Sequence, residues 1–92
     1  MSSDSRAIRI HALIEERLAP AHLEVQDESA AHIGHAGARE GGHFRVNIVS
    51  EEFQGLSSVA RHRLVYDAVR ELMGRDIHAL AIIARTPEEA SH

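Results

Sequence analysis

Apolar positions in the N-terminal segment recur every three or four residues, which is the spacing of one face of an α-helix. These positions are Ala7, Ile10, Ile14 and Leu18. Most of the charged residues between them fall off this face, so the helix is expected to be amphipathic. Asp4 or Ser5 is expected to cap the start of the helix, and Pro20 to end it.

Three shorter segments have the patterns of β-strands. Residues 22–28 and 43–50 alternate apolar and polar side chains, as half-buried strands do. Residues 77–84 are almost continuously apolar, which is typical of a strand buried on both faces. This third strand is therefore predicted to lie in the centre of the sheet.

A long helix is expected between the second and third strands, over residues 59–73. Ser57 or Ser58 can cap its N-terminus, and Gly74 is a suitable stop at its C-terminus. Its broad apolar arc consists of Val65, Ala68, Val69, Leu72 and Met73.

The element order α-β-β-α-β predicts one small α+β domain over residues 1–92. The first two strands would form an antiparallel hairpin, and a right-handed crossover would place the third parallel to the second. The result is a three-stranded mixed sheet covered by helices on one face. A flexible loop is expected at about 29–42, because this stretch is rich in glycine and long for a strand connection. A frayed tail is expected at about 86–92.

The composition of the chain argues against several kinds of site and function. The chain has no cysteine, which excludes disulfides and a self-sufficient cysteine metal site. Its formal net charge of −4 argues against nucleic-acid backbone binding as the main task. Without a signal-peptide pattern or an apolar run of about 20 residues, a cytoplasmic protein that does not enter a membrane is expected. No set of residues has the setting of a catalytic site, so an enzyme is not expected.

The chain has eight histidines, which are its main candidates for metal binding. By strand alternation His78 shares a face with Leu80 and Ile82, which favours a partly buried, hydrogen-bonded side chain over a metal ligand. His32 and His35 form an H-x-x-H pair in the predicted loop, either as solvated residues or as imidazole ligands for iron or zinc. His43 is interpreted first as a strand residue and second as a metal ligand.

The sequence Arg-His-Arg at 61–63 opens two interpretations. Arg63 and Arg70 fall on the polar side of the predicted helix, whereas Arg61 and His62 fall beside its apolar arc. Arg61 and His62 would then anchor the helix to its surroundings, or they would form part of a surface that contacts nucleic acid or a protein.

Four ordered blocks carry a family resemblance: LEVQDES, HFRVNIVSEEF, GLSSVARHRLVYDA and IHALAIIARTP. In this order and spacing they resemble the BolA family of small stress-linked proteins, over nearly the whole chain. The resemblance implies the α-β-β-α-β topology, which is related to the type II KH fold.

The resemblance also implies a function, namely partnership with a monothiol glutaredoxin and a shared [2Fe–2S] cluster in iron–sulfur trafficking and iron homeostasis. His78 matches the family's histidine ligand. The loop between the first two strands supplies the second ligand, for which His32 is the closer match and His35 the rival. The glutaredoxin cysteine and its bound glutathione would complete the set, so no cofactor is expected on the isolated chain and no small-molecule substrate is implied.

The alternative implied by the same resemblance is a DNA-binding transcriptional regulator. Arg61, Arg63 and Arg70 would contact phosphates from the long helix. KH domains grip nucleic acid with a GXXG loop between helices. The one such tetrapeptide here, at 34–37, lies instead between the first two strands, which is the wrong context.

Overall fold

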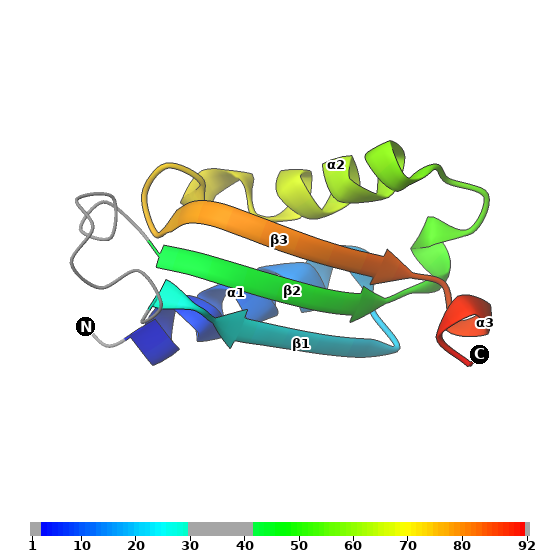
Figure 1. The fold of residues 1–92 in the computed structure, drawn as a ribbon, viewed down its shortest axis with the longest axis horizontal. Coiled ribbons are helices and arrows are strands. Elements are labelled where there is room, and N and C mark those ends of the chain that lie inside the picture. The colour runs from blue at the N-terminus through cyan, green and yellow to red at the C-terminus, as the bar shows by residue number, and fades with distance from the viewer. Residues whose placement is uncertain (1–2, 30–41, 92) are drawn as a thin grey trace.

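The computed structural model describes residues 3–29 and 42–91, and the elements that they form follow the predicted order (Figure 1). Short 3-10 helices at Glu51–Phe53 and Arg70–Leu72 flank the second long helix. The helices and strands are α1 (Ser3–Leu18), β1 (His22–Asp27), β2 (Gly42–Val49), α2 (Ser58–Ala68), β3 (Ile77–Arg85) and α3 (Pro87–Ala90).

The sheet is three-stranded and mixed, as predicted. β1 and β2 pair antiparallel, with Leu23 opposite Ile48, and β2 and β3 pair parallel, with Phe44 opposite Leu80. The order is β1-β2-β3, so the prediction that residues 77–84 form the central strand is wrong. β3 is an edge strand that packs against α2 on one face only, and its apolar residues Ala81 and Ile83 are exposed on the other. The Tyr66 hydroxyl donates to the Leu80 carbonyl at 3.2 Å.

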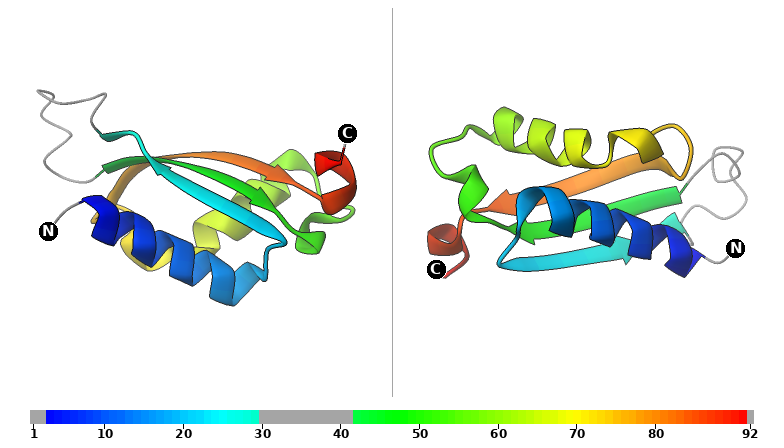
Figure 2. Two further views of the ribbon diagram at one scale, coloured as in Figure 1. Left: turned by 90° about the horizontal axis from the view of Figure 1, so that it is seen from below. Right: turned by 180° about the vertical axis from the view of Figure 1, so that it is seen from behind.

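Helices α1 and α2 lie on the same side of the sheet and leave its other face open (Figure 2). The predicted face of α1 is confirmed, since Ile10 and Ile14 are fully buried and Leu18 is nearly so. The core between the layers comprises these residues together with Phe44, Val46, Ile48, Phe53, Val65, Ala68, Val69, Ile77 and Leu80. Burial of these apolar side chains supplies the main driving force for folding.

Several predicted boundaries differ from the structure. Helix α1 begins at Ser3, so Asp4 and Ser5 lie within its first turn rather than before it. Ser57 caps α2 by accepting from the Ala60 amide at 3.2 Å, as predicted. The helix expected over 59–73 is interrupted, because Val69 leaves the helical region with ψ at 19° and a 3-10 turn follows. Apolar spacing does not distinguish these two kinds of turn.

The tail expected to fray is instead ordered as α3. Thr86 accepts from the Glu89 amide, and the Glu89 carboxylate accepts from the Thr86 amide, which forms a capping box around Pro87 in the first turn. The predicted flexible loop lies almost entirely outside the described residues, which resume at Gly42.

None of the helices within residues 3–29 and 42–91 has the length and apolar character needed to cross a membrane.

Candidate metal-binding site

A β-bulge at the start of β3 determines where His78 points. Gly42 pairs with Ile77 and His43 pairs with Ala79, so His78 is an additional residue in the ladder. It is exposed, whereas the preceding Ile77 and, two residues further on, Leu80 are buried. The prediction that His78 shares a face with Leu80 and is partly buried is therefore wrong, since a bulge shifts the strand alternation by one residue.

The bulge brings His78 beside His43 on the open face, defined here as the side of the sheet opposite α1 and α2. The two ring centroids are 5.3 Å apart, and the ring planes are tilted by 48°. His43 is half-buried on the central strand. The open face is formed on the first two strands by His22, Glu24, Gln26, His43, Arg45 and Asn47.

The backbone beneath this histidine pair is closely fixed. The His43 amide donates to the Ser29 hydroxyl at 3.0 Å, and the His43 carbonyl accepts from the Glu28 amide at 2.7 Å. Gly42 is buried, and a Cβ there would lie 2.6 Å from the ring of Phe44 and 2.7 Å from the Ser29 hydroxyl. Only glycine fits at this position without displacing its neighbours.

His32 and His35 lie outside the described residues, so their place relative to His78 stays a prediction. The described residues next to that segment, Ser29 and Gly42, both lie beside His43. Within 3–29 and 42–91 no three His, Cys, Asp or Glu side chains are grouped to hold a metal ion. Any metal ion bound by this pair of imidazoles would need further donors from outside the described residues.

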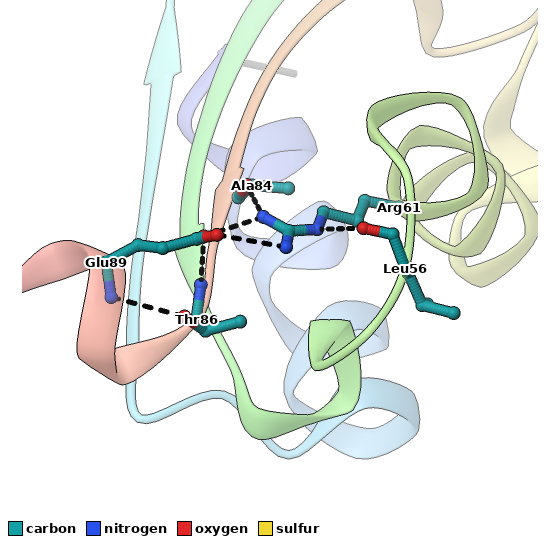
Figure 3. Close-up of polar contacts among 5 residues, drawn as sticks. All are labelled: Leu56, Arg61, Ala84, Thr86 and Glu89. Atoms are coloured by element: carbon teal, nitrogen blue, oxygen red, sulfur yellow. Dashed lines mark hydrogen bonds and ion pairs between the residues drawn. The ribbon is translucent and has the colours of Figure 1, made fainter.

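Arg61 occupies an internal position rather than a contact surface (Figure 3). Its Nε donates to the Leu56 carbonyl at 3.0 Å, and its Nη1 donates to the Ala84 carbonyl at 3.2 Å. Both terminal nitrogens also bind the Glu89 carboxylate, and the side chain is only 14% exposed. Hydrogen bonding to Glu89 raises the pKa of Arg61, and the same contact is the main reason that the pKa of Glu89 falls to about 2. The anchoring interpretation of Arg61 is confirmed.

The other arginines considered for nucleic acid are placed differently. Arg63 on α2 and Arg70 in the following 3-10 turn are exposed. His62 is half-buried and lines a surface pocket on α2 together with Val59, Arg63 and Tyr66. Arg61 is bonded inside the fold while Arg63 and Arg70 are exposed, and a role of the three arginines in phosphate binding stays a prediction.

Comparison with known proteins decides the family. The model of the family described as BolA-like protein matches residues 14–89. The chain belongs to this family. Three similar relatives are SufE-like protein 1, chloroplastic/mitochondrial, and Protein BOLA1, chloroplastic, both of Arabidopsis thaliana, and BolA-like protein 1 of Homo sapiens. Their identities to this chain are 45%, 41% and 48%, over 92%, 95% and 87% of it, respectively.

This BolA-like protein spans only part of those relatives, namely 24% of SufE-like protein 1 and 57% of each of the other two. Among solved structures, the BolA domain of SufE1 from Arabidopsis thaliana is 48% identical and superposes with a TM-score of 0.82. The match covers 92% of this chain and 95% of that one. BolA1 from the same plant gives a TM-score of 0.80 at 43% identity, over 91% of this chain and 94% of that one. These similarities confirm the predicted α+β fold.

The interpretation of His43 as a strand residue is confirmed, but the sequence did not reveal its contact with His78 or the pairing of Arg61 with Glu89. Both omissions concern pairs that are far apart in the chain. The useful signal for His43 was its position at the start of the strand that pairs with the strand of His78. The signal for Glu89 was the Thr-Pro-Glu-Glu sequence at 86–89, which is a helix start with a capping glutamate.

Proposed function

We propose that this BolA-like protein is the partner of a monothiol glutaredoxin and shares a [2Fe–2S] cluster with it through histidine. His78 would be one ligand, and His32 or His35 the other. The protein would act in iron–sulfur cluster trafficking, iron homeostasis and the stress response. The observation that carries this proposal is the exposed position of His78 on the bulge, at the open face of the sheet.

An exposed imidazole on a fixed backbone suits a ligand that a partner must reach. Within residues 3–29 and 42–91, α1 and α2 both lie on the other side of the sheet, so a partner-bound cluster could approach His78 without unfolding either helix (Figure 2). Imidazole is a suitable ligand for iron and binds it in the neutral form. The alternative role of His78, a buried side chain that supports the core, is inconsistent with its exposure.

The histidines of this chain can supply some of the ligands of a [2Fe–2S] cluster but not all of them. A [2Fe–2S] cluster takes four ligands, and this chain has no cysteine to supply thiolates. The proposal assigns the two missing thiolates to the glutaredoxin cysteine and to glutathione. When bound, the cluster would supply a one-electron redox centre with a potential raised by its imidazole ligands, as in Rieske centres.

The proposal assigns no catalytic step and no small-molecule substrate to the chain. A cytoplasmic location remains the expectation from sequence, although the names of two plant relatives refer to chloroplasts and mitochondria. Two observations count against DNA binding, the alternative function. Arg61 already binds the Glu89 carboxylate, and the net charge of −4 disfavours contact with a phosphate backbone. DNA binding becomes the working hypothesis only if the cluster test fails.

The test is a titration of a [2Fe–2S]-loaded monothiol glutaredoxin, followed by visible absorption and circular dichroism. The native protein is expected to produce a new spectrum that saturates at one to one. His78→Ala should fail to produce it, and His22→Ala should behave as the native protein, because His22 is an exposed histidine at the opposite end of the open face. An unchanged spectrum with the native protein would refute the proposal.

A further inference from the structure

We propose that the isolated protein binds a single divalent transition-metal ion of the zinc class between His43 and His78. This inference goes beyond the shared cluster, because it needs neither glutaredoxin nor glutathione. It also changes the expectation that the isolated chain holds no metal. The ring contact between the two histidines is the observation that carries it.

The spacing of the rings matches that of two imidazoles on one metal ion. Tetrahedral zinc binds imidazole nitrogen at about 2.0–2.1 Å, which places the centres of two ligating rings about 5 Å apart. The observed separation is 5.3 Å. The rings are tilted by 48° and not stacked flat, so small side-chain rotations could bring one nitrogen of each to a common point.

The two attachment points are held by the fold, so metal binding would not have to order the chain. His43 lies on the central strand, and its amide and carbonyl are both hydrogen-bonded. His78 lies on the bulge of the neighbouring strand, next to the fully buried Ile77. Just before the bulge, the Gly42 amide donates to the Asp76 carbonyl at 2.9 Å, which fixes the two strands relative to each other.

The described residues leave the remaining coordination positions of such an ion open. His78 is exposed, and its neighbours on the open face include the small side chain of Ala79. The carboxylate of Glu28, which directly follows β1, accepts from Arg45 at 3.0 Å. Since the described residues offer no third ligand, water would complete the coordination, and affinity would be lower than in a four-ligand structural site.

Isothermal titration of the isolated full chain with zinc chloride, together with NMR of the histidine ring nitrogens, tests this site. One ion per chain is expected, with the largest shifts at His43 and His78. His43→Ala and His78→Ala should each weaken binding at least about tenfold. His22→Ala should bind as the native protein does.

A double variant, His32→Ala with His35→Ala, separates this site from the loop histidines and is expected to retain zinc binding. Loss of binding in that double variant, or full binding in His43→Ala, would assign the ion elsewhere and overturn the inference. Absence of any zinc binding by the native chain would overturn it as well. None of these outcomes depends on glutaredoxin, so the inference and the proposed function can fail separately.

Discussion

Arg61 on α2 binds the carboxylate of Glu89 on α3 through both of its terminal nitrogens, at 2.7 and 3.1 Å. The same guanidinium donates to the carbonyls of Leu56 and Ala84 (Figure 3). One side chain therefore connects the start of α2, the end of β3 and the C-terminal helix. A single-turn helix such as α3 is not stable alone, so this contact explains its order.

Replacing Arg61 with alanine should destabilise the fold, because the carbonyls of Leu56 and Ala84 would lose their donor and α3 would lose its anchor. We expect the midpoint of thermal unfolding to fall by several degrees and amide hydrogen exchange to rise at residues 86–91. Arg63→Ala is the control, since exposed substitutions change stability by no more than about 0.5 kcal/mol. Equal effects of the two substitutions would refute the anchoring role.

Two carboxylates, those of Glu71 and Glu89, should make the free energy of unfolding depend on pH in the acid range. Hydrogen bonding to Arg17 lowers the pKa of Glu71 from 4.5 to about 2, and hydrogen bonding to Arg61 does the same for Glu89. A lowered pKa in the folded state means that the stabilisation is complete above pH 4.5 and is lost as the pH falls toward 2.

The free energy of unfolding in urea should therefore decrease between pH 5 and pH 3, and the decrease should be smaller in Glu71→Gln and Glu89→Gln. Both side chains are about half exposed, so solvent screening keeps each contribution modest. Glu24→Gln, at an exposed position on β1, serves as the control. If the Glu71 and Glu89 variants keep the native pH dependence, the two ion pairs do not control it.

Gly42→Ala should change the positions of the His43 and His78 rings, because Gly42 is packed directly next to His43 in β2. The new methyl group would lie 2.6 Å from the Phe44 ring, and such overpacking typically costs about 1–3 kcal/mol. We expect reduced stability in urea together with shifted ring signals of His43 and His78 in NMR spectra.

Gly55→Ala is the matched control for this substitution. Gly55 has a φ of +74° and open space where the Cβ would be, so its replacement strains the backbone without crowding the site. It should reduce stability and leave the histidine signals in place. Unshifted histidine signals in Gly42→Ala would show that the bulge does not depend on close packing.

The spacing of apolar residues predicted the helices and strands well, because an element that buries one face needs apolar side chains at regular intervals along its own sequence. Ile10, Ile14 and Leu18 face the core as their spacing indicates. It could not predict the orientation of His78, since the bulge arises from pairing with a strand that is distant in sequence. It also could not predict that Arg61 binds the carboxylate of Glu89. The loop ligands His32 and His35 remain predictions from the family resemblance.

The most direct test of the central claim is pulsed EPR of the reduced mixed complex with a monothiol glutaredoxin. The BolA-like protein would carry histidine labelled with nitrogen-15, and the glutaredoxin would be unlabelled. We expect the strong nitrogen-15 couplings of iron-bound imidazole with the native protein and with His22→Ala, and their loss or marked reduction with His78→Ala. A cluster spectrum without nitrogen-15 coupling from the native protein would contradict the account.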